Sequence, residues 1–142
     1  MPKSLSLHKE IPPTSSSAMP ISNLLRLQLF YCLMGILFNL ISWGILFQGE
    51  IGLTPTDPLI GIGVMLTYAL FLIPGRMGKL RLYRVLIGLS VLVFGYGGVI
   101  NHIILLAQSP EMYYSVMSGV IAILINLFGL GLNLMAVFGR FK

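Results

Sequence analysis

Charged residues are scarce in this chain, and their scarcity indicates its class. Only 9% of the 142 residues are Asp, Glu, Lys or Arg, whereas 56% are hydrophobic, and the mean hydropathy is +0.92. Soluble globular domains are about one quarter charged. The composition is therefore typical of an integral membrane protein rather than of a soluble domain.

The residues on which most enzymes and transporters depend are also missing. No charged side chain lies in the middle of an apolar run, which argues against ion-coupled transport and proton relays. The single cysteine, Cys32, excludes an intramolecular disulfide and every CxxC motif, and we expect it to be a small packed residue. Glu50, Asp57 and Glu111 are scattered without metal-ligand spacing, and no basic cluster with interleaved aromatics indicates nucleic acid. The sequence thus predicts no catalytic residue, no metal site and no nucleic-acid partner.

Four long apolar runs predict the fold. A membrane-spanning helix needs about 20 apolar residues, and three of the runs reach that length easily. The second run is short because prolines bracket it, and residues 1–22 are rich in proline, serine and threonine, which is typical of a flexible tail. We therefore expect an all-α membrane protein, a four-transmembrane-helix bundle over residues 23–142 with a flexible N-terminal tail. The expected spans are about 24–48, 59–74, 82–107 and 113–138.

The basic residues predict the orientation. All nine lie before or at the start of the first run, between the second and third runs, or after the fourth. The positive-inside rule then places both termini in the cytoplasm, and the short loops favour a bacterial inner membrane. Aromatic residues near the ends of the runs are expected to form interfacial belts. These are Trp43, Phe47, Tyr113 and Tyr114 on the outer side, with Tyr83 and Phe141 on the inner side.

Small and polar residues recur at alternating spacings of four and three along three of the runs. In lipid, helices associate through close backbone approach and interhelical hydrogen bonds, so this spacing predicts helix–helix seams in a left-handed bundle. Leu130, beside the stripe of the fourth run, is expected to face lipid. The stripes comprise Gln28, Cys32, Gly35, Asn39, Ser42 and Gly49 in the first run; Gly88, Val91, Gly95, Gly98 and His102 in the third; and Ser115, Gly119, Ala122, Asn126, Gly129, Asn133 and Ala136 in the fourth.

The polar residues inside the spans have two interpretations. An amide in hydrocarbon needs a hydrogen-bond partner. Each asparagine can therefore pair with another across the bundle, or the set can line a polar crevice for a ligand, with Tyr68 contributing. The candidate residues are Asn39, Asn101, Asn126 and Asn133.

His102 is the candidate cofactor-binding residue. It lies about 9 Å below the outer boundary, counting about 1.5 Å per residue, and it shares a face with Gly95 and Gly98. One interpretation is a neutral imidazole hydrogen-bonded across a seam, and the other is a haem ligand or a quinone contact. Bis-histidine haem ligation would need a second chain to supply its own histidine.

Three functions follow from these patterns. Glycine-rich seams without catalytic residues favour a non-enzymatic structural or accessory component of a membrane complex, or a homo-oligomer. Its partners would be the bilayer and other membrane subunits or a second copy of itself, and it would need no cofactor. The alternatives are a haem- or quinone-binding subunit that uses His102, and a small permease for a neutral solute that uses Asn39, Asn126 and Asn133. No stretch of the sequence carries a motif specific enough to name a family.

Overall fold

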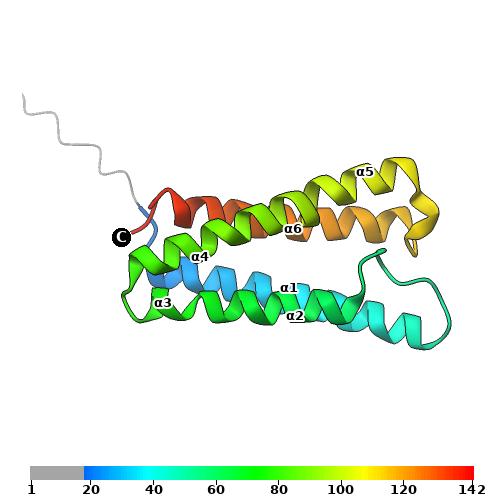
Figure 1. Cartoon of the computed structure of the whole chain (residues 1–142), viewed down its shortest axis with the longest axis horizontal. Helices are drawn as coiled ribbons and strands as arrows, with labels where there is room; N and C mark the ends of the chain where they lie inside the picture. The colour runs from blue at the N-terminus through cyan, green and yellow to red at the C-terminus, as the bar shows by residue number, and fades with distance from the viewer. Residues whose placement is uncertain (1–17) are drawn as a thin grey trace, which may run out of the picture.

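The computed structural model describes residues 18–142, which form a bundle of four antiparallel helical spans (Figure 1). The spans Ile21–Phe47, Pro58–Arg76, Leu80–Gln108 and Val116–Val137 are each long and apolar enough to cross a membrane. The all-α, four-transmembrane-helix fold predicted from the sequence is confirmed over these residues. The elements are α1 (Ile21–Phe47), α2 (Pro58–Phe71), α3 (Ile73–Arg76), α4 (Leu80–Leu92), η1 (Val93–Ile100), α5 (Asn101–Gln108), η2 (Pro110–Met112) and α6 (Val116–Val137).

The helix ends differ from the expected bounds for local reasons. The first span begins at Ile21, so the last two residues of the expected tail are helical, while residues 1–17 lie outside the described part of the chain. The fourth begins at Val116 because Ser115 and Ser118 form a capping box. Asp57 caps α2, and its carboxylate accepts a hydrogen bond from the backbone N–H of Leu59 at 2.8 Å. Tyr113 and Tyr114 are therefore loop residues rather than the start of a span.

The spans pair as two hairpins joined side by side. In Figure 1, α1 and α2 form the lower pair, and α4, η1 and α5 lie above with α6. The helix α2 packs along α1, and α6 packs along both η1 and α1, while α2 meets η1 through the rings of Tyr68 and Phe94. Both described ends of the chain lie at one end of the bundle, here called the terminal end. The opposite end, called the loop end, holds loops 48–57 and 109–115.

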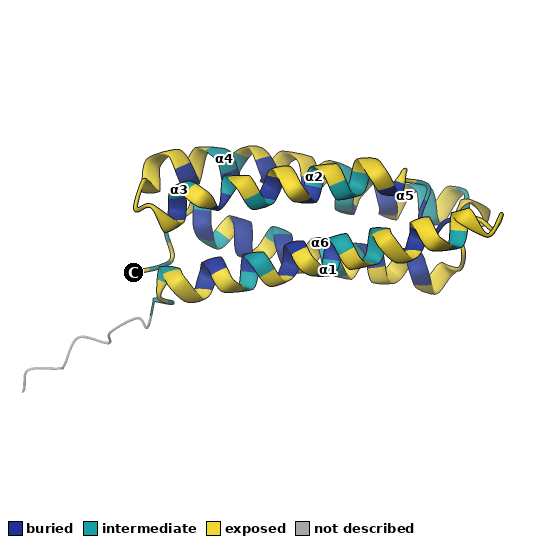
Figure 2. Cartoon of the chain, turned by 90° about the horizontal axis from the view of Figure 1, so that it is seen from below, coloured by how far each residue is buried: buried dark blue, intermediate teal, exposed yellow. Residues whose placement is uncertain are grey.

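The small-residue faces of the first and fourth runs turn inward, as Figure 2 shows for the buried positions. On α1, Gln28, Cys32, Gly35 and Ser42 are buried, and the Cys32 thiol donates a hydrogen bond to the Met65 carbonyl oxygen at 3.2 Å. These seams are confirmed, whereas Ser115 and Gly49 are exposed. On α6, the buried members of the stripe are Gly119, Ala122, Gly129, Asn133 and Ala136.

The prediction that Leu130 faces lipid is wrong. Leu130 is half-buried, and its Cδ1 would lie 3.7 Å from a Cβ built on Gly95 of η1. A glycine on the neighbouring helix leaves room for this leucine, which thereby becomes part of the seam between η1 and α6.

The third span departs from the predicted stripe. Gly88, Gly95 and Gly98 do face α6, but they are only half-buried. The reason is that the chain forms a π-helix over Val93–Ile100, whose wider turns shift the inward face. The most buried residues of this span are Tyr83, Ile87, Ser90, Phe94, Val99 and His102, with a spacing of five between Phe94 and Val99.

The terminal end is closed by Tyr83 and Phe141, two residues that the sequence predicts at the membrane–water interface. Tyr83 is fully buried, and its hydroxyl donates a hydrogen bond to Gln28 Oε1 at 2.6 Å. Its ring packs edge-to-face on Phe141, and the Arg84 guanidinium lies 5.2 Å from the centroid of the Phe141 ring. The backbone N–H of Lys142 donates to the Met19 carbonyl oxygen at 2.9 Å, which ties the C-terminal residues to the segment that precedes α1.

A candidate ligand cavity at the loop end

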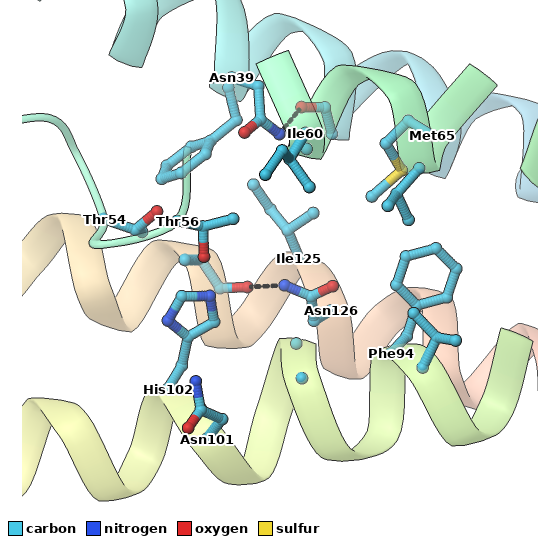
Figure 3. Close-up of a pocket in the computed structure, with 18 residues that line it drawn as sticks. Asn39, Thr54, Thr56, Ile60, Met65, Phe94, Asn101, His102, Ile125 and Asn126 are labelled. Carbon is cyan, nitrogen blue, oxygen red and sulfur yellow. Dashed lines mark hydrogen bonds between the residues drawn. The ribbon is translucent and has the colours of Figure 1, made fainter. Parts of the chain in front are cut away.

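A cavity of about 260 Å³ lies between the helices in the half of the bundle nearer the loop end (Figure 3). Every residue that lines it within the described chain is uncharged. It contains three of the four candidate asparagines together with His102, whereas Asn133 lies elsewhere. The lining residues are Gly35, Phe38, Asn39, Thr54, Thr56, Ile60, Gly61, Val64, Met65, Val93, Phe94, Gly97, Gly98, Asn101, His102, Ala122, Ile125 and Asn126.

His102 is held in place by a tyrosine from the adjacent loop. Nδ1 of His102 lies 2.9 Å from the Tyr113 hydroxyl oxygen, and that hydroxyl is 3.3 Å from the His102 carbonyl oxygen. Both contacts are satisfied when Nδ1–H donates to Tyr113 and Tyr113 donates to the carbonyl, which leaves Nε2 as a hydrogen-bond acceptor. Burial raises the pKa of the Tyr113 hydroxyl, so it stays protonated at neutral pH. The sequence predicts a partner for His102 on another helix. The partner is instead Tyr113, a loop residue eleven positions further along the chain.

This pairing predicts an order of stability among variants of His102. His102→Leu should lower the melting temperature in detergent more than His102→Gln, because leucine removes the hydrogen bond between Nδ1 and the Tyr113 hydroxyl oxygen, whereas glutamine retains a hydrogen-bonding group. The Tyr113 hydroxyl keeps its bond to the backbone carbonyl of residue 102 in both variants, so the expected cost of His102→Leu is about 0.5–1.5 kcal/mol. In a Tyr113→Phe background the extra cost of leucine should disappear, and an undiminished cost there would contradict the pairing.

Asn39 and Asn126 are bonded differently from the expected amide pairs across the bundle. Asn39 Nδ2 donates to the Gly35 carbonyl oxygen of its own helix at 2.8 Å, and Asn126 Nδ2 donates to the Ala122 carbonyl oxygen at 2.9 Å. Each side chain lies against a glycine of a neighbouring helix, Asn39 against Gly61 and Asn126 against Gly98, where a Cβ atom would overlap the carboxamide. These glycines therefore make room for the asparagines.

The two asparagines differ in what their oxygens do. Asn126 Oδ1 accepts a hydrogen bond from the Tyr31 hydroxyl at 3.2 Å. Asn39 Oδ1 receives none from the described residues. Figure 3 shows Asn39 on the α1 side of the cavity, and His102 and Asn101 on the opposite side. The described protein groups thus leave two polar atoms unpaired at opposite walls of the cavity: Asn39 Oδ1 and His102 Nε2, the latter an acceptor in the tautomer that satisfies both Tyr113 contacts.

An aromatic cluster separates the cavity from the terminal end. The rings of Tyr31, Tyr68 and Phe94 meet edge-to-face, with centroids 5.4 to 5.5 Å apart. Edge-to-face packing of this kind is favourable and directional, so the cluster makes a rigid floor. Tyr31 could not be predicted as part of this floor, because the sequence around a tyrosine inside an apolar run does not show which helices it will contact.

Below this floor lies a separate polar network centred on Asn133. Asn133 Oδ1 accepts hydrogen bonds from the Tyr68 hydroxyl at 2.7 Å and from Gln28 Nε2 at 3.0 Å. Tyr83 joins through Gln28, and all four side chains are buried. This is the amide pairing that the sequence suggested for the asparagines as a group, formed by Asn133 with a glutamine. Asn133 therefore belongs to the packing of the bundle and not to the cavity.

The cavity is small for haem. Residues 18–142 contain one histidine, His102, so two-histidine ligation would still need a second chain, as the sequence indicates. The volume of about 260 Å³ is also below the usual range of roughly 300–1,000 Å³ for pockets that hold drug-sized ligands, and a porphyrin needs more. A small uncharged ring or chain with hydrogen-bonding groups does fit.

The chemistry available in the cavity is hydrogen bonding to a neutral molecule. Asn101, Thr54 and Thr56 add amide and hydroxyl groups to the two acceptors, and Phe38, Met65 and Phe94 supply apolar walls. A few polar groups set in an apolar lining are typical of small-molecule sites. A scan against protein-family models, a search of curated proteins and a search of solved structures each found no match for this chain.

Proposed function

We propose that this integral membrane protein binds a small uncharged polar molecule in the cavity at the loop end. The observation that supports the proposal is the pair of polar atoms, Asn39 Oδ1 and His102 Nε2, left without a partner by the described residues on opposite walls of an uncharged cavity; both are acceptors in the His102 tautomer that satisfies both Tyr113 contacts. A few polar groups that converge on an apolar cavity are typical of sites that bind small molecules. A ligand with a hydroxyl group at each end, such as a quinol ring, would satisfy both acceptors.

The aromatic floor favours binding over passage through the bundle. Tyr31 and Tyr68 are almost completely buried beneath the cavity, and the Asn133 network fills the space below them. A neutral-solute permease would need these groups to separate. An accessory role in a membrane complex or a homo-oligomer stays a prediction from the sequence, and ligand binding by this chain is compatible with it.

The binding proposal is tested with a tail-less quinol and two glycine variants. Gly97 lines the cavity and Gly131 does not, and a Cβ on either would meet no atom within 4 Å. Leucine at either position should therefore be tolerated, and it raises helix propensity by up to about 1 kcal/mol. Tetramethylhydroquinone should raise the melting temperature of the wild type and of Gly131→Leu in detergent, because a ligand stabilises only the state that binds it. Gly97→Leu, which fills the cavity, should show no rise.

An equal rise in melting temperature for all three proteins would contradict the proposed site, because it would show that the quinol acts through the detergent or elsewhere on the protein. No rise for any of the three would contradict binding of a quinol-sized ligand altogether. The fully substituted ring is chosen because it hinders addition of the Cys32 thiol to any quinone that forms.

We further propose that both termini lie in the cytoplasm and that the membrane is a bacterial inner membrane. The support is the distribution of charge: the terminal end carries the loop with Arg76, Lys79 and Arg81, whereas Asp57 and Glu111 lie at the loop end. In this orientation the cavity lies in the outer half of the bilayer.

Reporter fusions should reveal this topology. A reporter placed after Lys142 or within residues 75–81 should report the cytoplasm, and one within residues 49–57 should report the outside. The physical reason is that basic loops are retained on the cytoplasmic side during insertion. An outside signal from the C-terminal fusion would contradict the orientation, while identical signals from the first two fusions would support the even number of crossings between them.

A further inference from the structure

A second hollow adjoins the ligand cavity. It is a groove of about 440 Å³ between α2 on one side and α4 and η1 on the other. The groove and the cavity adjoin, because they share four lining residues: Ile60, Val64, Val93 and Phe94. Tyr68 of α2 and Phe94 of η1 touch edge-to-face in its lining, while Ile60, Leu89 and Val93 are exposed, so the groove opens on the outer surface of the bundle.

The groove and the cavity differ in what they offer a ligand. Three polar side chains line the groove, and each donates its hydroxyl hydrogen bond within the protein. Thr67 donates to the Gly63 carbonyl oxygen at 2.9 Å, Ser90 donates to the Leu86 carbonyl oxygen at 3.2 Å, and Tyr68 donates to Asn133. The groove is therefore apolar in effect, whereas the cavity retains unpaired acceptors.

We infer that the cavity and the groove together bind one quinol-type lipid, with its uncharged ring in the cavity and its single apolar chain in the groove. This inference rests on the proposed function and extends it to the chemical class of the ligand. The cavity matches a ring with hydroxyl groups at opposite ends, because its unpaired acceptors lie on opposite walls. The adjoining apolar groove matches a chain attached to that ring.

Other occupants fit the two hollows less well. A phospholipid would bring a charged head to a site whose described lining contains no countercharge, and desolvating an unpaired charge is costly. A transmembrane helix of a partner could cover the groove, but it would leave Asn39 Oδ1 and His102 Nε2 without donors. Only a ligand with a neutral hydrogen-bonding head and an apolar chain uses both parts.

The test compares two quinols that differ only in their chain. The probes are tetramethylhydroquinone and a trimethylhydroquinone that carries a decyl chain, both added to full-length protein in the same detergent. Gly63 lines the groove but not the cavity, and a Cβ on Gly63 would meet no atom within 4 Å, so Gly63→Leu should fill the groove without disturbing the fold. Gly131→Leu is the matched control, since Gly131 lies outside both hollows and is equally unobstructed.

We expect Gly63→Leu to weaken binding of the decyl quinol by about tenfold while leaving the tail-less quinol unchanged, because the lost contact is apolar and confined to the chain. Gly131→Leu should bind both quinols as the wild type does. Elution of all three proteins at the same mass checks that each variant keeps its fold and oligomeric state.

The remaining outcomes separate the two proposals. Binding of the tail-less quinol with no effect of Gly63→Leu on the decyl quinol would overturn the groove assignment and leave the cavity proposal intact. Failure of both quinols to bind the wild type would overturn the proposed function itself. Displacement of the decyl quinol by an equal concentration of a lysophospholipid would overturn the neutral-head assignment, and a Gly63→Leu variant of reduced oligomeric mass would assign the groove to a second copy of the chain.

Discussion

Gly129→Leu is expected to destabilise the bundle by about 3 kcal/mol, at the upper end of what overpacking a well-filled core costs. Gly129 is buried on α6, and a Cβ at this position would overlap the ring of Tyr31 on α1. That ring cannot move aside easily, because Tyr68 and Phe94 pack against it and its hydroxyl is bonded to Asn126. The added side chain must therefore push α1 and α6 apart.

Gly131→Leu on the same helix provides the matched control. A Cβ on Gly131 would meet no atom within 4 Å, so the same substitution two residues away should cost nothing or stabilise slightly. The measurement is the free energy of unfolding in mixed detergent micelles. Equal losses for the two variants would contradict the contact between Gly129 and Tyr31. If Gly129→Leu does not assemble, Gly129→Ala in a Tyr31→Leu background should recover part of the stability that Gly129→Ala loses alone.

Asn133→Leu is expected to have an effect of comparable size. Asn133 Oδ1 accepts hydrogen bonds from Gln28 Nε2 and the Tyr68 hydroxyl, and both donors are buried. Leucine would strand the two donors in an apolar environment, at about 1–3 kcal/mol for each. Asn126→Leu should cost less, because it strands only the Tyr31 hydroxyl.

A double-mutant cycle tests the network directly. Tyr68→Phe should cost less in the Asn133→Leu background than in the wild type, because it then removes a donor that is already stranded. The free energies of unfolding of the four proteins supply the comparison. Strict additivity of the two substitutions would show that Tyr68 and Asn133 do not depend on one another.

The spans and the inward faces of α1 and α6 could be predicted because their signals are local. An apolar run of sufficient length and a three-and-four spacing of small residues are visible without knowledge of any partner helix. The buried positions Gln28, Gly35, Gly129 and Asn133 follow from that spacing.

The tyrosines could not be placed in this way. A tyrosine near the end of a span can lie at the interface or turn inward, and the choice depends on distant residues. Tyr83 turns inward because Gln28 accepts its hydroxyl hydrogen bond, 55 residues away in the sequence. Tyr113 turns inward because His102 lies across the loop.

The candidate site was predicted as a set of residues but not as an arrangement. Asn39, Asn101, Asn126 and His102 share one cavity, whereas Asn133 lies below the aromatic floor. The division depends on which glycines lie opposite the asparagines and on the aromatic contact between Tyr68 of α2 and Phe94 of η1. Neither property can be predicted from the spacing of small and polar residues along a single helix.

The π-helical segment Val93–Ile100 sets the rotational phase of the span that contains it. Each residue advances an α-helix by about 100°, so one residue more or fewer between Phe94 and Val99 would turn everything beyond it by roughly that angle. Tyr83 and Ile87 would keep their packing, while Asn101 and His102 would swing away from the cavity. The length of this segment thus sets the rotation of Asn101 and His102 about the helix axis relative to Tyr83 and Ile87. The half of the span that packs in the bundle and the half that lines the cavity can therefore be oriented independently.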